Sequence, residues 1–343
     1  MGVALLTGCR SGTGSDAASN FDSSNAVGGL HRFEFKQPQM GTLFTITLYA
    51  TDEVQARAAA DAAFAKIAAL ERRMTDYDPE SELMQLCQEP VGQSVRVSDE
   101  LFEVLQKGQR LAELSEGVFD VTIGPVVRLW RRARRTGTLP SPEMLARARA
   151  AVGYEKLSLD PVARTVTLTA PNMQLDLGGI AKGFAADKAL EVLKRHGLPR
   201  ALVAASGDIA IGDPPPDNRA WRVGIGAFDT NRADLAGNLL LRNAAVSTSG
   251  DLEQFVEIGG QRYSHIVDPR TGLGLTERLQ VTIVGKSTTD TDSFATAVSI
   301  LSVEKGMKLV ESQPGMAAVI LRKDGDRIEA FESRRFRRIP QAR

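Results

Sequence analysis

The stretch DLGGIAKGFAAD, Asp176 to Asp187, joins a predicted strand to a predicted helix but matches neither standard nucleotide-binding motif. A P-loop has its lysine directly before Ser or Thr, whereas here Lys182 precedes Gly183. A dinucleotide fingerprint reads GxGxxG, and the residues from Gly178 onward do not supply it. Both standard motifs are therefore excluded.

The chemistry of this loop still favours an anionic ligand. Paired glycines leave main-chain groups open to close approach, and the N-terminus of the following helix favours negative charge. Lys182 lies in the first helical turn, where a cation opposes the helix dipole, so we expect it to face an anion. The alternative is a glycine turn that packs a helix on a strand, with a lysine on the surface.

The composition is that of a globular protein without electrostatic bias. The chain has 343 residues, is 43% hydrophobic and carries 42 basic and 42 acidic residues. This balance argues against nucleic acid as a partner. Arginines gather at 131–135 and at 334–338, and most such clusters are solvated surfaces.

The N-terminal sequence MGVALLTGC resembles a bacterial lipobox that ends at Cys9. Residues 10–30 are rich in Ser, Gly, Asn and Asp, which is typical of a flexible tether. We therefore predict a signal remnant, lipid anchor and tether over residues 1–34 and a single domain over 35–343. The apolar stretch before Cys9 is short and lacks Lys or Arg, so the true start is expected upstream. The alternative is a disordered cytoplasmic N-terminus with a chance LTGC.

Predicted helices come early in the chain and predicted strands come late. Periodicity and capping residues predict a strand at 42–49, helices at 52–73, 98–115 and 140–153, a basic helical region around Trp130 and a loop at 74–83. Later come a hairpin at 156–169, helices at 181–196 and 290–301, and strands at 173–179, 201–211, 221–225, 239–247, 255–258, 279–284, 317–321 and 327–331. This order favours an α+β fold with mixed or antiparallel strands over a doubly wound sheet.

Among three histidines, His265 is the candidate for proton transfer. It lies in YSHIVDPRTG, where a predicted strand ends in a turn, whereas His31 falls in the tether and His196 ends a helix. A neutral His265 can accept a proton from an attacking hydroxyl, with Asp268 or Arg270 to orient it or to bind phosphate. A single histidine is more often structural, so this assignment depends on its neighbours.

A metal site is suggested by STTDTDSFATA, Ser287 to Ala297. If this segment is helical, Asp292 and Thr296 are one turn apart and project side by side. A carboxylate and a hydroxyl are hard oxygen ligands that suit Mg²⁺. In the alternative, Asp290 or Asp292 caps the helix and Thr296 is a core residue.

Taken together, these segments resemble the ApbE family over about residues 35–335. Eight of them occur in the family's order: MGT at Met40–Thr42, MTDYDPESEL at Met74–Leu83, GVFDVTIGP at Gly117–Pro125, DLGGIAKGFAAD, SGDI at Ser206–Ile209, VSTSGD at Val246–Asp251, YSHIVDPRTG and TDSFATA. One departure is Ser206-Gly207-Asp208, where the family usually has Gly-Gly-Asp. It puts in doubt any close backbone contact with a ligand at residue 206.

The resemblance implies an FAD:protein FMN transferase with a mixed α+β fold and an FAD cleft between lobes. Such enzymes use Mg²⁺ to move the FMN half of FAD onto a Ser or Thr hydroxyl of an acceptor protein, with release of AMP. By match to the family's motifs, FAD would contact Met40, Tyr77, Val118, Phe119, Asp120, Asp176, Lys182 and Ile266. The metal would be held by Asp292, Thr296 and the carbonyl of Gly179, and His265 would accept the acceptor's proton.

Two other functions stay open on the sequence alone. Water could replace the acceptor, which would make the chain an Mg²⁺-dependent FAD pyrophosphatase, or the chain could bind flavin as a lipoprotein without chemistry. The resemblance further suggests a membrane-associated redox subunit as the acceptor. With an anchor at Cys9, it suggests a position on the periplasmic side of the cell envelope, at the inner membrane.

Overall fold

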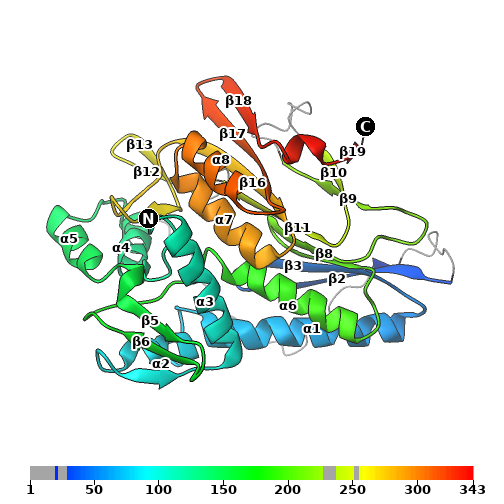
Figure 1. The fold of residues 1–343 in the computed structure, drawn as a ribbon, viewed down its shortest axis with the longest axis horizontal. Helices are drawn as coiled ribbons and strands as arrows, with labels where there is room; N and C mark the ends of the chain where they lie inside the picture. The colour runs from blue at the N-terminus through cyan, green and yellow to red at the C-terminus, as the bar shows by residue number, and fades with distance from the viewer. Residues whose placement is uncertain (1–19, 22–28, 227–236, 251–254, 343) are drawn as a thin grey trace, which may run out of the picture.

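A nine-stranded sheet with strand order β1-β2-β3-β7-β8-β11-β16-β17-β18 forms the centre of the molecule (Figure 1). The computed structural model describes residues 20–21, 29–226, 237–250 and 255–342. All neighbouring strands of this sheet pair antiparallel. The strands are β1 Asn20–Phe21, β2 His31–Gln39, β3 Thr42–Ala50, β7 Ala201–Ala205, β8 Asp208–Ile211, β11 Ala244–Gly250, β16 Arg278–Gly285, β17 Ala317–Asp324 and β18 Arg327–Glu332.

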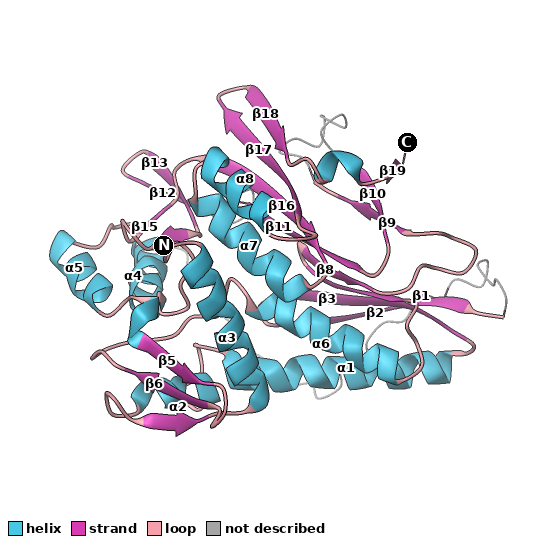
Figure 2. Cartoon of the chain, in the orientation of Figure 1, coloured by secondary structure: helices cyan, strands magenta, loops and turns pink. Residues whose placement is uncertain are grey.

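Helices cover one face of this sheet. The described helices are α1 Glu53–Met74, α2 Glu82–Gln88, α3 Asp99–Leu114, α4 Gly124–Thr136, α5 Pro142–Ala150, α6 Ala181–Arg195, α7 Thr288–Ile300 and α8 Val303–Ser312. Helices α1, α6 and α7 lie side by side over the sheet (Figure 2). Among the described residues, no helix is both long and apolar enough to cross a bilayer.

Simple patterns account for the best-predicted elements. Phe44, Ile46 and Leu48 alternate along β3, and all three are buried in the main core. Helix α1 begins where the Asp52 side chain accepts a hydrogen bond from the Gln55 amide, which satisfies a free N–H group of the first turn. The predicted early helices, the 156–169 hairpin and the α+β class are therefore confirmed.

Smaller sheets surround the central one. A three-stranded sheet of β9 (Trp221–Gly224), β10 (Asn238–Leu241) and β19 (Gln341–Ala342) contributes Trp221 and Leu239 to a second core. The ribbons β12 (Phe255–Ile258) with β13 (Gln261–Ser264) and β14 (Val267–Asp268) with β15 (Leu273–Gly274) lie near α4. Strands β4 (Ser94–Arg96), β6 (Thr165–Leu168) and β5 (Leu157–Asp160) form a third small sheet.

Three strand predictions need correction. Segment 173–179 is not a strand: within the described residues it pairs only through one bridge, between Gln174 and Ile123. Segment 201–211 is the β7–β8 hairpin, which turns at Ser206 with a φ of 57°. Segment 239–247 divides near Asn243, so β10 and β11 lie in different sheets. Turn residues with positive φ break these two apolar runs.

Two helix boundaries also differ from the prediction. The predicted loop at 74–83 ends early because Ser81 caps α2, which begins at Glu82. The helix predicted at 290–301 begins at Thr288, and its N-cap is Ser287. The alternative in which Asp290 or Asp292 caps this helix is therefore wrong.

The predicted tether ends earlier than residue 34. His31 begins β2 and is paired with Ala50, and Phe33 and Phe35 are buried in the main core. Burial of these two rings ties the start of β2 into the sheet. The predicted anchor at Cys9 and most of the tether lie outside the described residues, as does Asp251 of the VSTSGD segment.

Candidate functional site

The candidate site forms where α6 crosses α7. A side chain at Gly183 would begin 2.2 Å from the Thr288 carbonyl oxygen and 2.8 Å from Asp292 Cβ, so the two helices touch at this glycine. The backbone N–H of Gly183 donates to Oδ2 of Asp292 at 3.0 Å. The loop quoted above and the predicted metal helix are therefore in direct contact.

Two carboxylates converge on the ammonium of Lys182. Its Nζ atom lies 2.9 Å from Oδ2 of Asp208 and 3.5 Å from Oδ2 of Asp292. Both carboxylates are buried, with side chains only 6% and 4% exposed. Burial, and then the charge of Asp208, raise the pKa of Asp292 to about 7. Burial alone would lower the pKa of Lys182, but Asp292 and Asp208 raise it above its ordinary value.

Three oxygen atoms of the predicted metal set have no hydrogen-bond partner in the described part of the chain. Within the described residues, every hydrogen bond and ion pair of the Asp292 carboxylate uses Oδ2, which leaves Oδ1 open, and the Thr296 hydroxyl makes no hydrogen bond. The Gly183 N–H, which a regular helix would direct to the Gly179 carbonyl, bonds Asp292 instead. That carbonyl is therefore free of the helix ladder.

The residues that carry these three oxygen atoms are also close together. A side chain at Gly179 would begin 3.2 Å from Thr296 Oγ1 and 3.2 Å from Phe119. Carboxylate, hydroxyl and carbonyl oxygens are hard ligands, and few protein groups are expected around Mg²⁺. Among the described residues no group of three or more His, Cys, Asp or Glu side chains could hold a metal. The residues present therefore fit Mg²⁺ better than a metal that prefers sulfur or imidazole.

A second cluster brings Tyr77 and Asp176 together through Arg131. The Arg131 guanidinium pairs with Asp76 and lies 2.9 Å from Oδ2 of Asp176. It also stacks over the ring of Tyr77, 4.3 Å from the centroid. The Tyr77 side chain is still 76% exposed. Burial, and then the charge of Asp76, raise the pKa of Asp176 against the attraction of Arg131.

His265 lies at the end of β13 beside a small apolar cluster. Its neighbour Ile266 packs against Val118 and Ile300, so the predicted FAD residues Val118 and Ile266 are in one place. Asp268 and Arg270 pair with each other at 2.7 Å. Their bidentate pairing occupies both groups that were predicted to orient His265 or to bind phosphate.

Among the remaining predicted residues, Phe119 borders the same region. Phe119 reaches Gly179, and the Asp176 amide donates to the Val121 carbonyl at 2.8 Å, so the two loops are adjacent. Asp120 is buried and accepts two hydrogen bonds from Thr122, and burial raises its pKa. Met40, with a φ of 50°, sits in the β2–β3 turn and donates its amide to Glu71.

The ApbE family model matches residues 40–320 of this chain. The chain belongs to the ApbE family. An FAD:protein FMN transferase of Vibrio cholerae is 31% identical over 77% of this chain and 79% of its own length. The corresponding protein of Treponema pallidum is 32% identical over 82% of each chain.

Solved structures of the ApbE family share this fold. The flavin transferase ApbE from Vibrio cholerae superposes with a TM-score of 0.81 at 28% identity and covers 91% of this chain and 100% of its own. The apo form of the Pseudomonas stutzeri flavinyl transferase ApbE gives a TM-score of 0.79 at 29% identity. This match covers 90% of this chain and 97% of the other. The fold of this ApbE chain is thus that of flavin transferases.

Two residues of the candidate site were not found from the sequence. Asp208 was seen only as part of SGDI, and Arg131 only as one of a cluster of surface arginines. An isolated acidic residue after a turn carries no sequence signal for its partner. The place of Lys182 in the first turn of a helix did predict negative charge near its ammonium.

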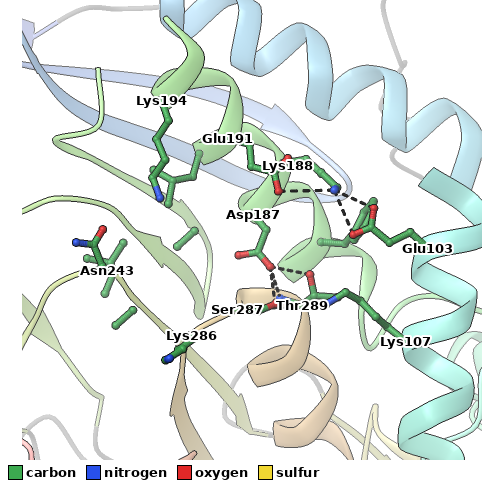
Figure 3. Close-up of a pocket in the computed structure, with 15 residues that line it drawn as sticks. Glu103, Lys107, Asp187, Lys188, Glu191, Lys194, Asn243, Lys286, Ser287 and Thr289 are labelled. Atoms are coloured by element: carbon green, nitrogen blue, oxygen red, sulfur yellow. Dashed lines mark hydrogen bonds and ion pairs between the residues drawn. The ribbon is translucent and has the colours of Figure 1, made fainter. Parts of the chain in front are cut away.

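A separate cavity of about 320 Å³ is lined by residues of α3, α6 and the start of α7, among others (Figure 3). None of the predicted site residues lines it. Asp187 of α6 points into this region and accepts hydrogen bonds from the Thr288 and Thr289 amides and from two hydroxyls. This carboxylate satisfies free N–H groups at the start of α7 and fixes that helix against α6.

Proposed function

We propose that this chain transfers the FMN moiety of FAD onto a Ser or Thr hydroxyl of an acceptor protein, with Mg²⁺ as the metal. The observation that carries the proposal is the meeting of Lys182, Asp292, Thr296 and the open Gly179 carbonyl at one helix crossing. A divalent cation beside an ammonium is an arrangement suited to a pyrophosphate. The names of the relatives support the same activity.

The metal would be held by Asp292 Oδ1, Thr296 Oγ1 and the Gly179 carbonyl. A bound Mg²⁺ would offset negative charge on the pyrophosphate oxygens. Lys182 keeps its positive charge because its two carboxylate neighbours raise its pKa. It therefore offers a fixed cation to the same phosphates, while Asp208 holds its ammonium in place at 2.9 Å.

The flavin end would lie toward the Arg131 cluster. Tyr77 has one ring face covered by Arg131 and a largely exposed side chain, which suits it to stacking on a flat ring. Asp176 is fixed by Arg131 and by the Gly178 amide, which donates to it at 2.8 Å. It is therefore positioned to accept hydrogen bonds from FAD rather than to move.

His265 accepts the proton in the proposed reaction. The acceptor oxygen forms a bond to the phosphorus on the FMN side, the bond from that phosphorus to the AMP oxygen breaks, and AMP leaves. The imidazole takes the hydroxyl proton as the oxygen attacks. Packing of Ile266 against Val118 limits movement of this loop.

We also propose that the enzyme works at the periplasmic face of the inner membrane, anchored through Cys9. The LTGC sequence and the polar stretch that follows it support this proposal. A membrane-associated redox subunit is the kind of acceptor that such an anchored enzyme reaches most easily.

The test is to mix the purified protein with FAD, Mg²⁺ and a candidate acceptor domain. The expected result is AMP release and an acceptor mass increased by one FMN group. Release of AMP and free FMN with unmodified acceptor would identify a pyrophosphatase instead. Intact FAD would identify a flavin-binding protein without this chemistry. Substitution His265→Asn should stop transfer while FAD still binds.

A further inference from the structure

Helices α4 and α5 carry a strong local positive charge in a chain that is neutral as a whole. Residues 124–153 contain seven arginines and a single glutamate, whereas the chain has 42 basic and 42 acidic residues. Only Arg131 turns inward to the candidate site. The other six are exposed: Arg128, Arg132, Arg134 and Arg135 on α4, and Arg147 and Arg149 on α5. We call these two helices the basic helix pair.

None of these six arginines forms an ion pair with a carboxylate within the described residues. Arg128 donates a hydrogen bond to the sulfur of Met84, and Arg147 donates one to the backbone carbonyl of Glu143. The other basic cluster, at the C-terminal end, is different because Arg334 and Arg337 pair with Glu311 and Glu332. The positive charge of the basic helix pair is therefore left available to a partner.

The basic helix pair lies directly beside the candidate site. On α4, Arg131 pairs with Asp176 and stacks over Tyr77. The neighbouring Trp130 donates a hydrogen bond of 3.2 Å to the carbonyl of Ser264, the residue before His265. On α5, Leu145 approaches Gly272 of the turn that follows His265. A partner on the outer surface of these helices is thus held next to both the proposed flavin end and the proposed base.

We infer that the basic helix pair is a docking surface for an acidic segment of the acceptor protein. The inference rests on the proposed function, since only a protein acceptor must bring a hydroxyl to His265. Unpaired arginines attract carboxylates and orient an incoming chain before it reaches the site. Guanidinium groups also bind carboxylates in a bidentate manner.

A membrane surface fits this position less well. Anionic lipid headgroups also attract arginines. A protein segment fits better, because the basic helix pair borders the proposed flavin end and the proposed base, where the acceptor hydroxyl must arrive.

The test compares two triple variants with the same change in net charge. The first is Arg132→Glu, Arg135→Glu and Arg147→Glu. The control is Lys194→Glu, Lys305→Glu and Lys308→Glu, which changes exposed lysines that have no ion pair in the described structure. The probes are a labelled Asp- and Glu-rich peptide with a central Thr, its Asn/Gln counterpart, and vesicles of phosphatidylcholine with phosphatidylglycerol.

The full-length parent should bind the acidic peptide and not the Asn/Gln peptide, and binding should weaken with salt. The arginine variant should lose about tenfold in affinity, roughly 1.4 kcal/mol, whereas the control should match the parent. Equal affinity in both variants would overturn the inference, as would loss of vesicle binding alone in the arginine variant. FAD affinity should stay unchanged in both variants, and AMP release at a saturating concentration of the acceptor domain should match the parent. Absence of AMP release in the parent itself would show a failure of the proposed function separately.

Discussion

The Nζ atom of Lys182 lies 2.9 Å from Asp208, closer than its 3.5 Å separation from the metal-ligand candidate Asp292. The lysine and the metal would compete for Asp292, since both are cations. Asp208, on strand β8, makes the shorter contact with the ammonium, and the lysine reaches only Oδ2 of Asp292, so Oδ1 stays open.

Substitution Asp208→Asn should therefore weaken Mg²⁺ binding about tenfold or more, as is usual for residues that orient a metal site. The amide removes one negative charge and lets Lys182 move toward Asp292. Calorimetric titration with Mg²⁺ measures the effect. The control is Asp290→Asn on α7, an exposed carboxylate that pairs with Lys107. Equal Mg²⁺ affinity in Asp208→Asn and the parent would contradict this role.

Removal of the Thr296 hydroxyl should disable the proposed metal site and keep the fold. Thr296→Val preserves shape but loses one oxygen ligand, so we expect about tenfold or greater loss of Mg²⁺ affinity, with AMP release reduced in parallel. Ser299→Ala removes a hydroxyl from the same helix that bonds only the Ala295 carbonyl, and it should keep full activity. A Thr296→Val protein with parental Mg²⁺ affinity would exclude this ligand.

Stability should depend on pH and on Mg²⁺ through Asp292. Burial and Asp208 raise its pKa to about 7, from an ordinary value of 3.8. The folded metal-free protein thus binds the proton more tightly than the unfolded chain, so its free energy of unfolding should fall as pH rises from about 4 to 7. Because Mg²⁺ needs the ionised carboxylate, its stabilising effect should be larger at pH 8 than at pH 5.5.

Thermal unfolding with and without Mg²⁺ at these two pH values checks this dependence. Other buried carboxyls with raised pKa, such as Asp120 and Asp176, contribute in the same direction. The informative quantity is therefore the difference between the parent and Asp292→Asn, which should lose the Mg²⁺ effect. An Mg²⁺ effect of equal size at both pH values would refute the assignment.

Ser206 should be a site of stored backbone strain. Its φ of 57° lies in the left-handed region, in the β7–β8 turn where the family usually has glycine. Ser206→Gly should raise the free energy of unfolding by up to about 1 kcal/mol, because the cost of this conformation outweighs the extra freedom of unfolded glycine. Denaturant unfolding measures it. Ser158→Gly in the exposed face of β5 should be destabilising instead.

The sequence predicted those parts of the fold that local periodicity and capping specify. The alternating side chains of 42–49 and the capped helices after Asp52 and Ser98 are local patterns, and the structure contains all three. Turns were harder, because apolar runs such as 201–211 look continuous until a positive φ reverses the chain at Ser206. A local sequence pattern does not specify which strand will pair with the segment after the turn.

The candidate site was predicted from the order of its motifs rather than from geometry. Lys182 and Asp292 are 110 residues apart in sequence, so their contact depends on the tertiary fold. The pairing of Arg131 with Asp176 could not be predicted for the same reason, since it requires α4 to pack beside the 174–176 loop. The order of the motifs predicted which residues belong to the candidate site. The contacts between those residues depend on how the helices and loops pack.

The four bonds from Asp187 to the start of α7 have a consequence for biosynthesis. Asp187 and Ser287 are separated by 100 residues, and strands β7, β8, β11 and β16 of the central sheet lie between them in sequence. A nascent chain that has emerged only as far as α6 holds Gly179 but neither Asp292 nor Thr296. The proposed cation site would therefore form only when the chain through α7 is present and the middle of the sheet has closed, so uptake of Mg²⁺ would report this stage of folding.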